Sequence, residues 1–430
     1  MASLAAERHK ENLRRGLATL TMGSFTPQTA LGHRGWTTEL ILATFEQALT
    51  GEPPSSGIEY KRGGRGDGFD ALGFKFERNP KEVKDFDSVD ISLSLNRKKY
   101  GPRITISCPW YGAGMSYGSV SLNFMRARAK AAKLYNTFTS TGEGGYPDEL
   151  TPYQDSVITQ VSTGMFGVRE ETIQKCRIME FKYAQGAKPG LGGHLLADKN
   201  TVDIARMRGT VPNVSLYQPF PFHSVYSVED HKKHVDWART INPDMLVSVK
   251  VSTPIDVDMV AIGIYYAGAH IIHLDGGYGG TGAAPEFAKK NIAMPIELAV
   301  PKVHKYLTEE GVRDDILLMA SGGVRTADDI AKAIALGADG CVIGAAEAVA
   351  AGCTQCGNCE RGRGCQIGIA TSDRELSSLM EPDWGAERIL NLYRAWSKEL
   401  KRIVAALGLK SVAELRGRKD LLTYRRPSYD

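Results

Sequence analysis

Residues 316–350 read ILLMASGGVRTADDIAKAIALGADGCVIGAAEAVA, and this stretch decides the fold class. An apolar strand at 316–320 is followed by a glycine turn and by a helix that begins after the N-cap Thr326 and stops at Gly337. A second strand follows at 342–343. A strand, a helix and a strand in succession predict a parallel sheet, because the helix carries the chain back to the edge where it started.

The same alternation extends towards the N-terminus. Strand-like runs occur at 104–107, 246–251 and 271–274, and helical patterns occupy 120–134 and 257–267. The βα order and the length of the pattern favour a closed (β/α)8 barrel of the TIM type over an open doubly wound sheet. We therefore expect an α/β protein built on such a barrel.

The pattern divides the chain into four expected regions. Residues 1–95, with their Gly/Pro-rich stretches, form an irregular N-terminal region packed on the barrel, and residues 96–350 form the barrel itself. A cysteine-rich loop covers 351–372, and a helical extension covers 373–430. Within the extension, a helix at 385–407 carries apolar residues at helical spacing, which predicts a core-facing stripe.

Composition excludes several classes of function. The net charge is +4, from 53 basic and 49 acidic residues, which argues against a nucleic-acid or anionic-membrane partner. No apolar run approaches the roughly 18 residues that a membrane-spanning helix needs, and the N-terminus has no apolar signal core. Cys108, Cys176 and Cys341 are isolated and are expected to be buried, reduced thiols. We therefore expect a cytoplasmic protein.

Four of the seven cysteines lie close together, at Cys353, Cys356, Cys359 and Cys365. Their spacing is C-x2-C-x2-C-x5-C. Structural zinc usually takes two separated C-x2-C pairs, whereas successive x2 intervals are typical of an iron–sulfur run. The spacing therefore favours an iron–sulfur cluster over zinc as the metal site.

Glycine turns follow two consecutive predicted strands, at Ser321-Gly322-Gly323 and at Gly344-Ala345. Each alone is compatible with an ordinary turn, but loops after strands 7 and 8 of such barrels commonly bind a phosphate through backbone N–H groups. The loop at 275–283 holds five glycines, which leaves room for a flat ligand or a moving lid. Lys250 ends an apolar strand, where a lysine can stabilise a reduced flavin or can simply be a solvated surface residue.

Several blocks together resemble the FMN-binding domain of glutamate synthase, over residues 105–375. They include Thr141-Gly142-Glu143-Gly144-Gly145, which matches TGEGG, and residues 184–190, which match AQGAKPG. Residues 279–283 match GGTGA, and 368–371 match GVAT except for one conservative change. Met115-Ser116-Tyr117-Gly118 resembles the first turn that contacts the flavin in this family.

The resemblance implies FMN as cofactor and 2-oxoglutarate or glutamate, with an amine, as substrates. It implies catalytic roles for Glu143, for Lys188 and Arg208 as keto-acid contacts, and for His194, which replaces a substrate-binding glutamine. An acid of the family has become Leu191, and Tyr278 replaces a common aspartate. The implied cofactor contacts are Met115, Ser116, Tyr117, Gln160, Lys250, Gly279, Gly280, Thr281, Gly282, Gly322, Gly323, Gly344 and Ala345.

The resemblance also implies a 3Fe-4S cluster, because the family uses three cysteines that match Cys353, Cys359 and Cys365. Cys356 is an additional cysteine and the last interval is one residue longer, so a 4Fe-4S cluster stays open. No cysteine precedes Cys108, so the N-terminal cysteine of the family's amidotransferase is missing from this sequence. We expect separate amidotransferase-like and glycine-rich β-helix subunits, and hence a hetero-oligomer.

A glutamate synthase distributed over separate chains resembles methylamine–glutamate N-methyltransferase, also called N-methylglutamate synthase. The expected function is therefore that of a flavin and iron–sulfur oxidoreductase subunit that forms N-methylglutamate from methylamine and glutamate. The alternative is the FMN subunit of a glutamate synthase that makes glutamate from 2-oxoglutarate and ammonia. An alternative of another class is a non-catalytic electron-transfer or scaffold subunit.

Overall fold

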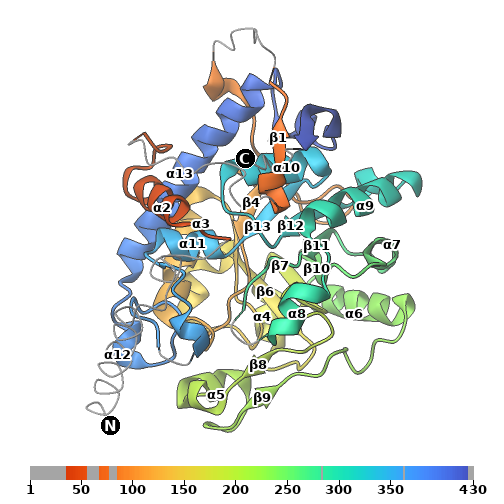
Figure 1. Cartoon of the computed structure of the whole chain (residues 1–430). Helices are drawn as coiled ribbons and strands as arrows, with labels where there is room; N and C mark the ends of the chain where they lie inside the picture. Colours follow the sequence, from red (N-terminus) through yellow and green to blue (C-terminus); the bar gives the residue numbers. More distant parts are fainter. Residues whose placement is uncertain (1–34, 56–66, 77–84, 282–283, 362–363, 425–430) are drawn as a thin grey trace.

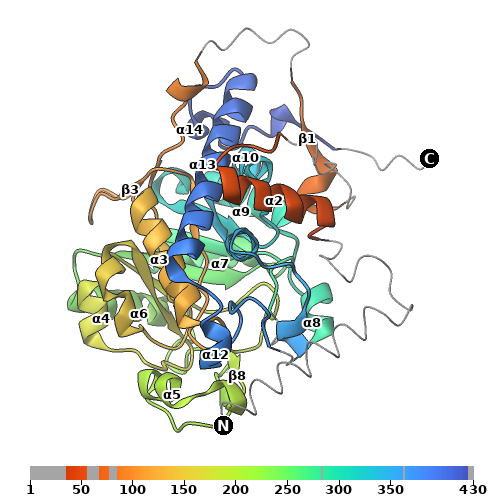
Figure 2. The ribbon, with the colours of Figure 1, turned by 90° about the vertical axis from the view of Figure 1, so that its left-hand side faces the viewer.

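A computed structural model describes residues 35–55, 67–76, 85–281, 284–361 and 364–424 (Figures 1 and 2). Its centre is an eight-stranded sheet in the order β4-β13-β12-β11-β10-β7-β6-β5. The paired neighbours in this sheet run parallel. The strands are β4 (Trp110–Gly112), β5 (Thr139–Ser140), β6 (Val157–Ser162), β7 (Ile178–Lys182), β10 (Leu246–Ser252), β11 (Ile271–Asp275), β12 (Leu317–Ser321) and β13 (Gly340–Ile343).

The sheet closes between its first and second strands. The Gly112 N–H donates to the carbonyl of Phe138 at 2.8 Å, and Gly114 and Ser140 form a parallel bridge one step further along. These contacts join β4 to β5 and complete the barrel. The predicted (β/α)8 barrel is therefore confirmed, with β12 and β13 as its seventh and eighth strands.

Helices surround the strands (Figure 1). They are α3 (Leu122–Tyr135), α4 (Glu170–Lys175), α6 (Val228–Ile241), α7 (Val257–Tyr266), α8 (Glu286–Asn291), α9 (Ile296–Glu309), α10 (Ala327–Leu336) and α11 (Ala345–Ala350). The α10 boundaries agree with the sequence prediction, because the Thr326 side chain accepts from the Asp329 N–H and Gly337 takes a positive φ of 123°. In the described part of the chain, no helix is long and apolar enough to cross a membrane.

A small hairpin closes the amino-terminal end of the barrel. Strands β2 (Leu93–Ser94) and β3 (Thr105–Ile106) pair antiparallel, and their apolar side chains join the cluster inside the barrel with Tyr111, Phe138 and Val342. The predicted strand at 104–107 therefore exists, but it is not one of the parallel barrel strands. A short apolar run has the same sequence pattern in either setting, so the pattern could not reveal its partner.

The two terminal extensions pack on the same side of the barrel. Helix α13 (Pro382–Ala406) lies along α3 and is crossed by α2 (Thr38–Thr50) (Figure 2). Its Trp396 makes an edge-to-face contact with Trp110, with ring centroids 5.9 Å apart, so the predicted core-facing stripe is confirmed. Strand β1 (Leu72–Phe74) pairs antiparallel with β14 (Leu422–Tyr424). Besides short 3-10 helices, the other described elements are α5 (Val202–Arg208), α12 (Arg374–Ser377), α14 (Val412–Leu415), β8 (His194–Leu195) and β9 (Leu216–Tyr217).

Candidate functional site

A hydrogen-bonded network of polar side chains lies inside the carboxyl-terminal half of the barrel. Glu180 of β7 accepts from Gln160 Nε2 at 2.7 Å and from Ser248 Oγ at 3.0 Å. Its second oxygen lies 2.9 Å from His273 Nδ1, and His273 Nε2 lies 2.8 Å from Ser321 Oγ. Burial alone would raise the pKa of Glu180, but His273 and Lys250 lower it to about 2. The strands thus contribute an ionised carboxylate at the centre of the barrel.

Asp275, at the end of β11, forms a buried ion pair with Lys250. Lys250 Nζ lies 3.1 Å from its Oδ2, Ser321 Oγ donates to its Oδ1 at 2.7 Å, and the Gly186 N–H donates at 3.0 Å. Burial alone would raise the pKa of Asp275, but Lys250 and His273 lower it to about 2. The ammonium group of Lys250 is therefore paired with Asp275, and its role as a cofactor contact stays a prediction.

The predicted catalytic residue Glu143, in the loop after β5, forms another ion pair with Lys182. Lys182 Nζ, at the end of β7, lies 2.6 Å from Glu143 Oε2 and also donates to Gln185 Oε1 at 3.1 Å. Burial alone would raise the pKa of Glu143, but Lys182, Lys188 and Arg208 lower it to about 2. Glu143 is consequently an anion at neutral pH.

Two further cations adjoin this carboxylate. Lys188 is only 2% exposed, and its Nζ forms no hydrogen bond or ion pair within the described ranges. Burial lowers the pKa of Lys188, and Glu143 opposes the shift. Arg208, the last residue of α5, donates from Nη2 to the Tyr117 carbonyl at 3.0 Å, while its buried Nε has no partner among the residues described. Three cations therefore surround one carboxylate, which leaves excess positive charge.

His194 completes the group of predicted catalytic residues. It lies on β8, and its ring packs edge-on against Tyr217 with centroids 5.1 Å apart. Burial and the nearby Lys188 lower the pKa of His194, so its imidazole is neutral at pH 7. The fold thus brings Glu143, from the loop after β5, close to Lys188, His194 and Arg208, which all lie in the long connection between β7 and α6. The roles of these residues stay predictions.

The predicted cofactor contacts on the first loops also converge. A Cβ placed on Gly142 would lie 2.5 Å from Ser116 N, and one on Gly344 would lie 3.3 Å from the Met115 side chain. A Cβ on Gly114 would lie 2.9 Å from Gln160 Nε2. Met115 therefore reaches from the loop after the first strand to the loop after the eighth, where Ala345 begins α11.

The loops after the sixth and seventh strands form another part of the rim. Gly322 has a φ of +88°, and a Cβ there would lie only 2.5 Å from the carbonyl of Gly276. Gly279 turns back over Asp275, while Gly280 has open space beside it. Thr281 is half-buried in the same loop. Of the predicted contacts, Gly282 lies outside the described residues. Glycines thus occupy much of this part of the rim, because close packing at positions such as Gly322 leaves no room for a side chain.

The four predicted metal ligands lie on one half-buried loop. Cys353 and Cys365 pack against the barrel core, and Gln355 donates to Cys353 Sγ from its backbone N–H at 3.4 Å and from Nε2 at 3.5 Å. Burial raises the pKa of Cys353 to about 12, and the nearby thiols of Cys365, Cys359 and Cys356 add to the shift. Among the residues that the structure describes, no three His, Cys, Asp or Glu side chains are arranged to hold a metal ion.

This cysteine loop is joined to the first rim loop. The Ser121 N–H donates to the Ile369 carbonyl at 2.7 Å, and Ser121 Oγ donates to the Gly368 carbonyl at 2.6 Å. Ser121 also caps α3, directly after the turn that holds Met115 and Tyr117. The segment after the cysteines therefore fixes the position of a turn at the barrel mouth.

Sequence reasoning missed the strand residues on which the site is built, namely Lys182, Glu180, His273 and Asp275. Each is a charged or polar residue inside or at the end of an apolar run, such as RIMEFK and IIHLD. Such positions at the carboxyl ends of barrel strands are where catalytic residues gather. The signal was present, but β7, which carries Glu180 and Lys182, was not among the strands predicted, and His273 and Asp275, in and directly after the predicted strand at 271–274, were not singled out.

The fold and the site together define a (β/α)8 barrel with glycine-rich loops at its mouth and three cations around the carboxylate of Glu143. Residues 69–410 match the family model described as the conserved region in glutamate synthase. The chain is 41% identical over 355 residues to the archaeal glutamate synthase (NADPH) of Methanocaldococcus jannaschii, covering 80% of this chain and 69% of that protein. The chain therefore belongs to the glutamate synthase family.

Other relatives are longer than this chain. The archaeal-type glutamate synthase (NADPH) of Dehalococcoides mccartyi is 41% identical over 319 residues, covering 74% of this chain and 64% of that protein. The glutamate synthase (NADPH) large chain of Azospirillum brasilense is 36% identical over 315 residues, covering 72% of this chain but only 21% of the relative. The chain thus spans about two thirds of its archaeal-type relatives.

Solved structures support the fold alone. A flavocytochrome b2 variant with sulfite bound superposes with a TM-score of 0.52 at 15% identity, covering 90% of this chain and 84% of that one. A second flavocytochrome b2 variant gives a TM-score of 0.51 at 16% identity, covering 96% and 91%. These likenesses agree with the barrel described above.

Proposed function

We propose that this chain is the FMN-dependent synthase component of a glutamate synthase, which forms glutamate from 2-oxoglutarate and ammonia. The observation that carries the proposal is the pocket in which Lys182, Lys188 and Arg208 surround the single carboxylate of Glu143. A buried cation without a partner is costly, so such a pocket is stabilised by an anionic ligand. The names of the relatives reported above favour ammonia over methylamine as the amine.

The excess positive charge suits a dicarboxylate such as 2-oxoglutarate. Arg208 presents a planar guanidinium with an unused buried Nε, which can pair with a carboxylate through two parallel hydrogen bonds. Lys188 is nearly fully buried beside it and can neutralise charge at the keto-acid end. Binding of the substrate would thus satisfy the donors that the protein itself leaves unpaired.

The barrel mouth also fits FMN. The turns at Gly322-Gly323 and Gly344-Ala345 follow the seventh and eighth strands, where barrels commonly hold a phosphate with backbone N–H groups. Met115, which reaches the Gly344 turn, gathers with Ser116 and Gln160 around the loop after the first strand, where they would contact the ring. When bound and reduced by an electron donor, FMN would supply the hydride that reduces the carbon–nitrogen double bond formed from the keto acid and ammonia.

The chain's own residues would hold the nitrogen and exclude water. Glu143 is ionised at neutral pH, so it accepts hydrogen bonds from an ammonium or iminium N–H and orients that group. Lys182 fixes the carboxylate at 2.6 Å and so sets its direction. In the resting protein Glu143 is therefore an orienting group and holds no proton to donate.

We also infer that the cysteine loop holds an iron–sulfur cluster. Four thiols on one loop are the right donor chemistry, and the Gln355 N–H donors are of the kind that stabilise a thiolate ligand. Cluster assembly would have to draw the loop into a binding arrangement, because metal binding and local folding are commonly coupled. Iron and acid-labile sulfide content, with an electron paramagnetic resonance spectrum, would distinguish a 3Fe-4S from a 4Fe-4S cluster.

The proposal includes partners. Relatives that carry the same region in a longer chain suggest that ammonia production and electron supply lie on other domains or subunits. We infer a hetero-oligomer with an amidotransferase-like subunit and a glycine-rich β-helix subunit, in a compartment that keeps thiols reduced.

A single-turnover assay tests the function. The purified chain is loaded with FMN and reduced under anaerobic conditions, and 2-oxoglutarate with ammonium is added while flavin absorbance is followed. The proposal predicts reoxidation of the flavin with one glutamate formed per flavin. A parallel sample with oxidised flavin receives methylamine and glutamate, because that exchange is redox-neutral and begins with oxidation of glutamate. Product only from this pair would replace the proposal with N-methylglutamate synthesis, and no product from either pair would leave the electron-transfer or scaffold function.

A further inference from the structure

The N-terminal segment at residues 67–76 is fastened to the barrel by a buried arginine. Asp70, in the 3-10 helix η2 (Gly68–Ala71), accepts two hydrogen bonds from Arg325, with Nη2–Oδ1 at 2.7 Å and Nη1–Oδ2 at 3.1 Å. Arg325 lies two residues after Gly323, in the loop that leaves the seventh strand. Both side chains are about nine-tenths buried, so this bidentate pair is shielded from water.

Arg325 also forms hydrogen bonds with Asp329 and with the Gly35 carbonyl. Its Nε lies 3.2 Å from Asp329 Oδ2, its backbone N–H donates to the same oxygen at 2.9 Å, and Nη1 donates to the Gly35 carbonyl at 3.0 Å. Two carboxylates and one carbonyl thus occupy nearly all of its donors, and the three charged groups carry a net negative charge. Arg325 therefore does not supply positive charge to a phosphate, and it acts as an anchor for the loop.

A second contact joins the same segment to the glycine loop after β11. The Tyr278 ring lies between Gly68 and Gly323, since a Cβ at either glycine would be 3.3 Å or 3.2 Å from its ring carbons. The Tyr278 hydroxyl donates to Glu297 Oε1 at 3.2 Å, at the start of α9. Residues in η2 thus touch both rim loops.

The N-terminal segment at residues 67–76 also packs against helix α10, which follows Arg325. Lys332 Nζ, in α10, donates to the Phe69 carbonyl at 2.9 Å, and β1 lies beside α10 (Figure 1). Every residue of α10 is buried, although helices on the outside of a barrel usually expose one face. The N-terminal segment is therefore part of the wall that supports the loop after the seventh strand.

We propose that Asp70 is a positioning residue for the phosphate end of the flavin site, because it fixes Arg325 and thereby the backbone of residues 322–326. The inference rests on the proposed function, since it presumes that this loop receives the FMN phosphate. Main-chain N–H groups bind a phosphate well only when they are held in place before it arrives. The ring contacts at Met115 and Gln160 come from other loops and do not depend on the Asp70–Arg325 pair.

The proposal predicts a defect that is specific to the phosphate. Flavin-free protein is titrated with FMN and, separately, with riboflavin, which has the same ring without the phosphate. Asp70→Ala should weaken FMN binding by roughly tenfold or more, the equivalent of one charge-assisted hydrogen bond, and leave riboflavin binding within about twofold. Asp70→Asn keeps one acceptor for Arg325, so it should fall between the wild type and Asp70→Ala and tests the pair if the alanine variant fails to fold.

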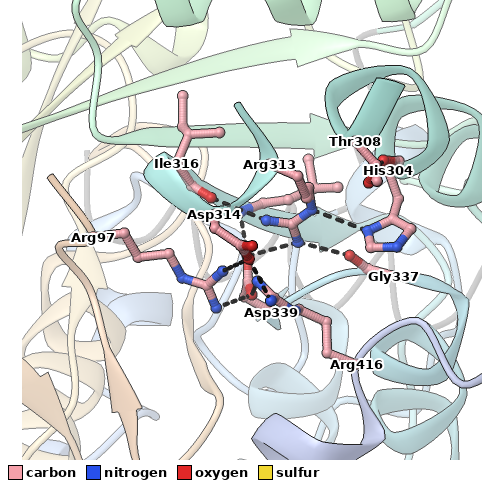
Figure 3. Close-up of polar contacts among 10 residues, drawn as sticks. Arg97, His304, Thr308, Arg313, Asp314, Ile316, Gly337, Asp339 and Arg416 are labelled. Atoms are coloured by element: carbon pink, nitrogen blue, oxygen red, sulfur yellow. Dashed lines mark hydrogen bonds and ion pairs between the residues drawn. The ribbon is translucent and has the colours of Figure 1, made fainter. Parts of the chain in front are cut away.

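The buried pair of Asp339 with Arg313, at the other end of the barrel, is the matched control (Figure 3). Asp339→Asn should lower the unfolding temperature without changing the ratio of FMN to riboflavin affinity. Equal weakening of both flavins by the Asp70 variants, or an unchanged FMN affinity, would overturn the positioning role alone. A wild-type protein that binds neither flavin would instead overturn the proposed function, and one that binds both equally would remove the phosphate site.

Discussion

A cluster of buried charges lies at each end of the barrel, and the cluster around Asp339 is more completely paired than the cluster around Glu143. At the amino-terminal end, Asp339 accepts from Arg313 Nη2 at 2.9 Å and from the Leu318 N–H at 2.7 Å, and Arg97 and Arg416 pair with its other oxygen (Figure 3). At the carboxyl-terminal end, Lys188 forms no hydrogen bond or close ion pair within the part of the chain that is described, and the buried Nε of Arg208 has no partner there.

Arg313 shows how complete the amino-terminal network is. Its guanidinium donates to the carbonyls of Ile316 and Gly337 at 3.0 and 2.8 Å, and its Nε donates to His304 Nδ1 at 3.0 Å (Figure 3). A network whose donors and acceptors are matched stabilises the fold, whereas unmatched donors are strongly favoured to bind a ligand. The difference indicates which end of the barrel is structural and which is functional.

We expect the largest effect on turnover from a substitution at the carboxyl-terminal end of the barrel, where donors of the site are unpaired. Lys188→Ala should lower turnover by roughly a thousandfold or more, because it removes a preorganised charge from the substrate. The unfolding free energy should stay the same or rise, because a buried cation without a partner is removed. Steady-state kinetics and thermal unfolding of the flavin-loaded protein measure both. The control is Lys232→Ala, an exposed lysine on α6. Unchanged turnover in Lys188→Ala would favour the electron-transfer or scaffold function.

A substitution in the Asp339 network at the amino-terminal end should instead lower stability and leave turnover unchanged. Asp339→Ala leaves three arginines without their common anion, so we expect a loss of about 3–5 kcal/mol in unfolding free energy. Turnover per folded molecule should not change. Chemical denaturation gives the free energy, and Asp314→Ala is the control, because Asp314 pairs with Arg416 at 2.6 Å but its side chain is 84% exposed. Equal losses of unfolding free energy in Asp339→Ala and Asp314→Ala would contradict a stabilising role for the buried Asp339 network.

A steric change sharpens the comparison within the functional end. A Cβ on Gly193 would lie 2.2 Å from Glu143 Oε1, so Gly193→Ala must displace that carboxylate from Lys182. We expect turnover to fall by about a hundredfold, with a stability cost of about 1–3 kcal/mol. Gly190→Ala in the same loop is the control, since a Cβ there meets no atom within 4 Å and adds only backbone strain. Similar kinetics for both variants would show that Glu143 tolerates displacement.

The smallest effect is a pH dependence at the structural end. Burial and the neighbours Arg313 and Lys419 lower the pKa of His304 to about 4, although Asp339 and Asp314 oppose the shift. The unfolded chain therefore binds the extra proton first, so stability falls as the pH drops below the ordinary value of 6.5. We expect His304 to account for about 1 kcal/mol of loss between pH 7 and pH 5, allowing for solvent screening of this half-buried ring.

His304→Gln isolates this contribution, because the glutamine carbonyl can accept from Arg313 without titrating. Unfolding free energies measured from pH 7 to pH 5 should fall less steeply in the variant than in the wild type. Identical slopes would assign the acid sensitivity to other buried groups, such as His231 and His270, whose pKa values are also lowered by burial.

Much of the fold and part of the site could be predicted because they depend on local pattern. The strand at 316–320, the Thr326 cap and the Gly337 stop follow from hydrophobic period and capping chemistry, which act over a few residues. The loop motifs around Glu143 and Lys188 were likewise visible as unusual sequences. The β2–β3 hairpin was misplaced, because which strand pairs with an apolar run depends on residues far away.

The sequence by itself determined that this chain is an α/β barrel of the glutamate synthase family, since periodicity and motifs are local and survive without a structure. Only the tertiary structure decided which charges meet. Lys182 and Glu143 are 39 residues apart and Asp70 and Arg325 are 255 apart, yet each pair forms a buried ion pair. Coulombic and hydrogen-bonding energies depend on distance in space and on burial, and both are set when the barrel closes and the N-terminal segment packs against it.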